Sequence, residues 1–353
     1  MKPPVGKAVV RILLSRWFVP AVLALAVALR LAWALQVTPT QVDDFAWYLT
    51  RGAKLAAGEG YSNNRGEVSA FWPIGYPAFL AGLFALFGAD PLVAKLANVG
   101  FAVAGAWLAH LLARRLFQSE LAGRVALLLL ALYPNHVIYA SLIASEHLFV
   151  FLMLLGTWLV LRAERSTRLA CAAGAVFGCA TLVKPQAVLL PILVVLLAGL
   201  ASRPGWRVVL HRLACVYLVL FAMLVPWTVR NYRAFGGLVF VSTNGGFNLL
   251  AGNNPSASGY SSWTDELKKQ VSERAGPGAN ELEVDRAARE LAFEYMRQHP
   301  REVLALLPRK LFLLFNDERD GTWWNLRGLP AGDEQGQALL RRLVPWTTWT
   351  FRA

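Results

Sequence analysis

Long apolar runs alternate with short basic stretches over most of the chain up to residue 229. A helix that crosses a bilayer needs about 20 consecutive, mostly apolar residues. Candidate runs lie at residues 18–36, 92–113, 121–140, 142–161, 169–183, 186–201 and 209–227. The pattern predicts an all-α polytopic membrane protein with about seven transmembrane helices.

Basic residues cluster between these runs and predict an orientation. With seven spans, the four clusters fall on one side of the membrane, opposed only by Glu120 and Glu164. The clusters are Lys2, Lys7, Arg11 and Arg16; Arg114, Arg115 and Arg124; Arg162, Arg165 and Arg168; and Arg203, Arg207 and Arg212. The positive-inside rule makes that side cytoplasmic. We therefore expect a multi-pass protein of the cytoplasmic membrane.

Residues 73–88 are also apolar but too short to span a bilayer comfortably. If they crossed, every later basic cluster would move to the outside, so we expect them to lie at the outer surface. The chain then divides into a transmembrane core, residues 1–229, with a first outer loop at 37–91, and an outer-face segment, residues 230–353.

The two outer segments predict different elements. Glycines break residues 37–72 into short helical pieces. In the second segment we expect turns over residues 228–264 with a short strand at Leu238–Ser242, and a helix over 280–300, where apolar residues recur at helical spacing. Residues 302–315 predict an apolar, basic helix at the membrane interface.

The composition excludes two broad classes. The chain is 56% hydrophobic and 16% charged, whereas soluble domains are about 45–50% apolar and about 25% charged. An aqueous globular protein and a disordered chain are both disfavoured.

Residues 1–229 hold 19 Lys and Arg against 8 Asp and Glu, so the net charge of +13 follows membrane topology and not a nucleic-acid footprint. Cys171, Cys179 and Cys215 lie in apolar runs, which excludes a disulfide framework.

Two adjacent carboxylates, Asp43 and Asp44, follow the first apolar run directly. Acids at a membrane surface are costly unless they are solvated, paired or used. Neighbouring carboxylates raise each other's proton affinity, which suits a general base. The alternative is a solvated helix start, with the acids serving as cap and first-turn residues.

Other ionisable residues gather at the same predicted face: Arg30, Glu146, His147, Lys184 and Arg230. Charges at membrane depth are expensive, so each is a functional candidate. The cations could instead snorkel to the interface, and Glu146 could simply pair with one of them. His147 fits a structural hydrogen bond better than a metal site, because no second ligand stands at suitable spacing.

Together, cations facing a carboxylate pair predict a site for an anionic amphiphile such as a lipid-linked phosphate. Asn253 and Asn254, in a segment rich in glycine and asparagine, could contact a ligand or form ordinary turns. Phosphate-loop, zinc and dinucleotide signatures are lacking. We predict no metal, no cofactor and no nucleic-acid partner.

An ordered set of motifs resembles a known family. They are Asp43-Asp44, Phe71–Leu80 (with Tyr76), Ala113–Phe117, Ser145–His147, Val183–Pro185, and Pro226–Tyr232 continuing through Gly252–Pro255. The chain resembles bacterial integral-membrane glycosyltransferases of the type C superfamily, in particular the relatives of protein O-mannosyltransferase and lipid A aminoarabinose transferase. Members usually continue through further spans after the outer segment, and no long apolar run follows residue 230 here.

The resemblance implies a polyprenyl-phosphate sugar donor, a lipid, glycan or protein acceptor, and an active site facing the periplasm or outside. It maps the catalytic base to Asp43, with Asp44 second. It assigns the lipid phosphate to Arg230, then Lys184, then Arg30. Further substrate contacts are expected from the remaining candidates, Tyr76, Glu146, His147, Asn253 and Asn254.

Two other classes stay open. One is a polyprenyl-lipid transporter or flippase, whose intramembrane charges would line a path, although the repeated halves common in transporters are not visible. The other is a non-catalytic partner that binds polyprenyl lipids and assists an enzyme.

Overall fold

The computed structural model describes residues 11–163, 166–316 and 319–349, and the regular elements in this part of the chain are helices. The predicted all-α class is thereby confirmed. The helices are α2 (Phe18–Gln36), α3 (Asp43–Ala56), α4 (Gly75–Phe87), α5 (Pro91–Leu116), α6 (Glu120–Leu132), α7 (Pro134–Ile138), η1 (Tyr139–Ser141), α8 (Glu146–Ala163), α9 (Thr167–Val183), η2 (Pro185–Leu189), α10 (Leu190–Ser202), α11 (Trp206–Phe235), α12 (Gly245–Gly252), α13 (Asp265–Ala275), α14 (Glu281–Gln298), α15 (Pro300–Asn316), α16 (Asp320–Gly328) and α17 (Glu334–Trp349). Lys2, Lys7, Glu164 and Arg165 of the predicted orientation lie outside the described residues.

Among the described residues, five helical segments are long and apolar enough to cross a membrane: α2, α5, α8, η2 with α10, and α11. A sixth forms if α6 and the following helix, Pro134–Ser141, count as one span bent by 52°. The remaining predicted span, residues 169–183, is α9, which is apolar but has only 17 residues. The apolar run predicted not to cross, residues 73–88, forms the 13-residue helix α4.

The chain forms two compact units. The core unit takes in residues 1–59, 75–223 and 319–347, and the polar unit takes in residues 60–74, 224–318 and 348–353. The predicted boundary at residue 229 divides the chain by membrane side, whereas this division follows compactness. It assigns α16 to the core unit, although that helix lies far along the chain.

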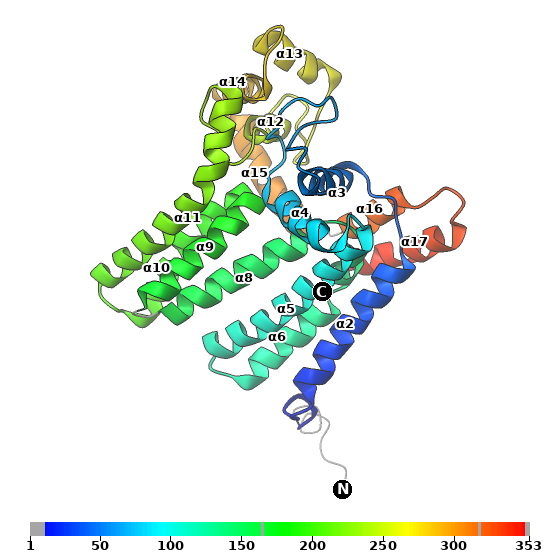
Figure 1. Ribbon diagram of the computed structural model, residues 1–353, viewed down its shortest axis with the longest axis vertical. Coiled ribbons are helices and arrows are strands. Elements are labelled where there is room, and N and C mark those ends of the chain that lie inside the picture. The colour runs from blue at the N-terminus through cyan, green and yellow to red at the C-terminus, as the bar shows by residue number, and fades with distance from the viewer. Residues whose placement is uncertain (1–10, 164–165, 317–318, 350–353) are drawn as a thin grey trace. The chain divides into compact units, whose positions relative to one another are not determined.

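In the core unit α2, α5 and α6 lie side by side, and α8 packs on α5, α9 and α10 (Figure 1). Small residues allow close helix contact, as is usual between membrane helices. A Cβ atom on Gly156 of α8 would lie 2.7 Å from the ring of Phe177 on α9. A Cβ on Gly174 of α9 would lie 2.4 Å from the carbonyl oxygen of Val216 on α11.

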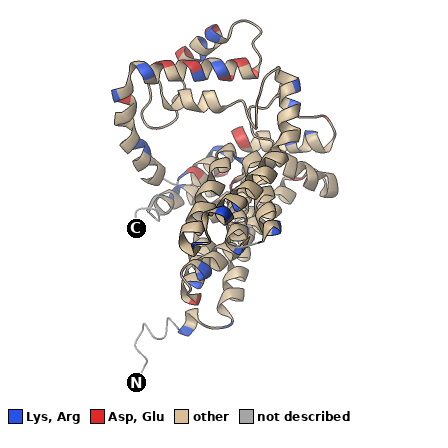
Figure 2. Ribbon diagram, turned by 90° about the vertical axis from the view of Figure 1, so that its left-hand side faces the viewer, with Lys and Arg blue, Asp and Glu red and all other residues tan. Residues whose placement is uncertain are grey.

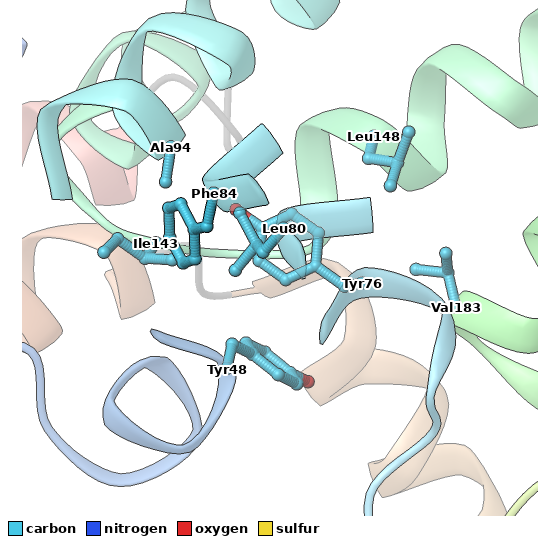
Figure 3. Close-up of a cluster of buried hydrophobic side chains, with 8 residues drawn as sticks. All are labelled: Tyr48, Tyr76, Leu80, Phe84, Ala94, Ile143, Leu148 and Val183. Carbon is cyan, nitrogen blue, oxygen red and sulfur yellow. The ribbon is translucent and has the colours of Figure 1, made fainter. Parts of the chain in front are cut away.

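A buried cluster joins α3 and α4 to this bundle (Figure 3). Tyr48 of α3 meets Tyr76 of α4 edge-on, with ring centroids 5.3 Å apart. Leu80 of α4 is fully buried in the same cluster, which Ile143 and Val183 complete. The cluster holds α3 against α4 and against residues that precede α8 and end α9.

In the polar unit α12 and α13 pack on α14. The predicted helix over 280–300 is confirmed as α14, whose start is set by a capping box between Asn280 and Glu283. The helix predicted at 302–315 is α15. Charges of both signs cover α13 and α14 at the top of Figure 2, so these helices suit an aqueous surrounding.

The strand predicted at Leu238–Ser242 is wrong. The segment is irregular, although Val239 and Val241 are buried. Its carbonyl groups accept hydrogen bonds from side chains of α11: Asn231 donates to Val239, and Trp227 donates to Val241 at 2.7 Å. Side-chain donors thus take the place of a neighbouring strand.

Two glycines of α4 make a matched test of the packing. A Cβ on Gly75 would lie 2.5 Å from the backbone of Leu182 and Val183, whereas one on Gly82 would meet nothing within 4 Å. We expect Gly75→Ala to destabilise the protein by about 1–3 kcal/mol through overpacking. Gly82→Ala should leave stability unchanged or raised, because alanine favours a helix. Thermal unfolding of the detergent-solubilised protein measures both, and equal melting temperatures would contradict the α4–α9 contact.

Candidate active site

The predicted acidic pair begins α3. Val42 is extended and precedes Asp43, whose φ of +48° lies in the left-handed region. Aspartate tolerates that region better than most residues, since its short polar side chain can bond locally. The Asp43 side chain is 46% exposed, while Asp44 is partly buried.

The charges of a lysine and a glutamate act on Asp44 of this pair. Lys184 ends α9, because Pro185 follows and holds it extended. Its Nζ donates to Oε1 of Glu146, the first residue of α8, at 2.9 Å. The second oxygen of Glu146, Oε2, is buried and accepts no hydrogen bond from the described residues.

These four groups form one electrostatic cluster, here called the acid–lysine cluster: Asp43, Asp44, Glu146 and Lys184. Burial first of all, and then the negative charges of Glu146 and Asp43, raise the pKa of Asp44 to about 6 against the opposing charge of Lys184. A carboxyl group with a pKa near neutrality can take up a proton and lose it again under working conditions.

Arg327 of α16 joins this cluster, and the sequence analysis missed it. Its Nη1 lies 2.7 Å from Oδ2 of Asp43. The guanidinium lies over the rings of Trp323 and Trp324, at 5.2 and 5.5 Å from their centroids. The Trp-Trp pair near an arginine was visible in the sequence, but no spacing links it to the first outer loop.

Arg30, predicted to bind phosphate, is fully buried. Its guanidinium donates to the carbonyls of Ala131 at 2.9 Å, Leu130 at 3.0 Å and Ala26 at 3.2 Å. The first two belong to the last turn of α6, which ends before Pro134. Helix ends leave carbonyls without partners, and a cation there also favours the helix dipole. These contacts give Arg30 a structural role.

His147 and Tyr76 are likewise buried in the core unit. His147 Nε2 is 3.0 Å from the carbonyl oxygen of His136, and the two imidazole rings meet edge-on. The Tyr76 hydroxyl exchanges hydrogen bonds with Asn98, which also donates to carbonyls after η1. Both residues fill hydrogen-bonding positions in packed surroundings.

Arg230 belongs to the polar unit. Its guanidinium donates to the carbonyls of Ser69 at 2.7 Å and Tyr61 at 2.6 Å, and to Oδ1 of Asn231 at 3.0 Å. It also lies 4.5 Å from the ring centroid of Trp227. Arg230 therefore fastens residues 60–74 to α11.

The asparagine pair also lies in the polar unit, where both side chains hold a turn. Asn254 is buried, donates to the carbonyls of Leu250 and Ser262, and accepts from the amide of Ser256. Asn253 donates to a carbonyl of α12 and accepts from Lys310 Nζ at 3.1 Å. Within the described residues, no three His, Cys, Asp or Glu side chains come together as a metal site would require.

The part of the chain that the structure describes thus combines apolar helices of membrane-spanning length with an acid–lysine cluster at the ends of three helices. Residues 72–229 match the family model of dolichyl-phosphate-mannose-protein mannosyltransferase, and the predicted resemblance to type C glycosyltransferases is confirmed. The matched segment includes Tyr76, Glu146, His147 and Lys184, while Asp43 and Asp44 precede it. No curated protein matches the chain.

The contacts of Arg30 lead to a prediction. Arg30→Met should lower the melting temperature markedly, because buried carbonyls of α6 lose charged donors worth about 1.5–3 kcal/mol each. The affinity of the folded fraction for a polyprenyl phosphate should stay within about twofold, a change of roughly 0.4 kcal/mol. Unfolding and lipid-binding assays on one detergent preparation separate the two effects. Loss of lipid binding at unchanged stability would show that Arg30 binds the phosphate.

Proposed function

We propose that the chain is a glycosyltransferase that moves a hexose or pentose from a polyprenyl-phosphate-linked donor to a lipid, glycan or protein acceptor. The observation that carries this proposal is the acid–lysine cluster in a chain whose core matches a mannosyltransferase family. The basic clusters between the spans support an active site on the outer face of the cytoplasmic membrane of a bacterial cell envelope.

Lys184 is our first choice for the donor phosphate. It presents an ammonium group at the end of an apolar helix and pairs with a carboxylate rather than with backbone carbonyls. A phosphate can share or replace that carboxylate, because a lysine has three donors. Arg230 is a weaker candidate, since its donors already serve three oxygen atoms.

The proposed reaction is a displacement at the anomeric carbon. The acceptor oxygen or nitrogen forms a bond to that carbon while the bond to the phosphate oxygen breaks. Polyprenyl phosphate leaves with the electron pair, and Lys184 stabilises its charge. Asp43 accepts the proton that the acceptor loses, and Asp44 orients the acceptor or the sugar.

The catalytic base can be tested directly. Asp43→Asn should lower turnover about 10²- to 10⁴-fold with donor binding retained, and Asp44→Asn should be milder. Transfer of radiolabelled mannose from a polyprenyl-phosphate-mannose into membrane lipid and protein fractions measures both. Glu59→Gln is the matched control, because Glu59 is an exposed acid just after α3 that pairs loosely with Lys54 at 3.8 Å. Asp43→Asn turnover above about a tenth of wild type would refute the assignment.

The raised pKa of Asp44 predicts the pH dependence. If Asp44 acts ionised, transfer falls as the pH drops through about 6, where this carboxyl takes up a proton. Glu146→Gln removes a negative charge that raises this pKa and frees Lys184, which lowers it. Both effects move the acid limb of the rate profile to lower pH. An acid limb that stays in place, or moves to higher pH, would show that Asp44 does not set it.

A further inference from the structure

Helix α16 is fixed to the chain around the acidic pair by complementary backbone contacts. The amide of Thr40 donates to the carbonyl of Gly328 at 2.8 Å. A Cβ on Gly328 would lie 2.3 Å from the carbonyl oxygen of Thr40, so only glycine fits this contact. The last turn of α16 therefore lies against the segment that leads into α3.

Side chains hold the same helix from a second direction. Asn325 is fully buried, accepts from the Ser141 hydroxyl at 2.6 Å and donates to the Ile138 carbonyl at 3.3 Å. The ring of Trp324 meets Phe45 of α3 edge-on, with centroids 5.4 Å apart. Because α16 is anchored on η1 and on α3 together, its next side chains have little freedom relative to Asp43.

Arg327 is restrained in its turn. Its guanidinium lies over two indole rings that are themselves in edge contact, with centroids 4.6 Å apart. Aromatic contacts of this kind limit the rotamers of an arginine. The guanidinium then holds Oδ2 of Asp43. Within the described residues, no side chain or amide donates a hydrogen bond to Oδ1.

We propose that Arg327 is a positioning residue for the reaction: it fixes the Asp43 carboxylate through Oδ2 and leaves Oδ1 to receive the acceptor's proton. The inference rests on the proposed function, in which Asp43 is the base. It extends the active centre to α16, beyond the segment that matches the family. A general base contributes most when its lone pair is held toward the proton it removes.

The alternative is an ordinary surface ion pair, because both side chains are about half exposed. Isolated exposed pairs contribute little. Arg114 serves as the control: it is 59% exposed and lies 3.1 Å from Glu120, a carboxylate that also pairs with Arg124 and takes part in no proposed step. Arg114→Met removes an exposed arginine of the core unit that contacts a carboxylate, far along the chain from α3.

A first experiment tests the contact without relying on enzyme activity. In the full-length protein, Asp43→Cys is labelled with anionic sulfonatoethyl and cationic trimethylammonioethyl methanethiosulfonates, and the rate for protein without this cysteine is subtracted. Adding Arg327→Met should lower the anionic-to-cationic rate ratio about three- to tenfold, because a positive charge beside the thiol is lost. Arg327→Lys and Arg114→Met should leave the ratio within about twofold. An unchanged ratio with Arg327→Met overturns the proposal.

A second experiment tests the catalytic consequence with polyprenyl-phosphate-mannose as donor. Arg327→Met should lower kcat at least tenfold with the KM for donor within about threefold, and Arg327→Lys should recover part of kcat. Arg114→Met should match wild type. A kcat for Arg327→Met within twofold of wild type, or no recovery with lysine, overturns the positioning role. If wild-type protein transfers no sugar, the proposed function fails, while the labelling ratios still decide whether Arg327 holds position 43.

Discussion

The structure depends on one constraint: wherever an apolar helix breaks, its unpaired carbonyls must find donors within the protein, because the lipid offers none. Arg30 meets this need at the end of α6, and Asn98 meets it in the segment between η1 and α8. In the polar unit Arg230 likewise pairs the carbonyls of Tyr61 and Ser69 in the irregular segment 60–74, where burial alone creates the need. Long polar side chains at helix ends are therefore first of all a means of completing the backbone.

This constraint separates the candidate site residues into two kinds. Cations whose donors are spent on carbonyls, such as Arg30, complete the fold, whereas Lys184 and Arg327 hold carboxylates that are partly open to solvent. A carboxylate side chain can move away from its cation, so a substrate phosphate can take its place. A backbone carbonyl is fixed by the fold and cannot be replaced in this way. The proposed reaction therefore uses the cations that pair with carboxylates and not those that pair with backbone carbonyls.

Much of the fold was predictable because the hydropathy of a segment depends only on the residues of that segment. The spans follow from apolar length, and α14 follows from its spacing and its capping box. The strand at Leu238–Ser242 failed because its carbonyls bond side chains of α11, which no local pattern reveals. For the same reason the sequence predicted which charges follow apolar runs but not that Arg30 caps a helix. The contact between Asp43 and Arg327 joins distant segments, so only the tertiary structure reveals it.

The two acids of the pair differ in the cation that acts on each of them. Asp43 has Arg327 at 2.7 Å, while Asp44 has the positive charge of Lys184 against burial and two neighbouring negative charges. In the proposed reaction the donor phosphate competes for Lys184. As it binds, the influence that lowers the pKa of Asp44 is weakened, so the charge of Asp44 depends on a lysine that the donor also needs. Asp43 keeps its arginine whether or not the donor is bound. The ionised state that a general base needs is therefore better secured at Asp43 than at Asp44, which favours Asp43 as the base of the proposed reaction.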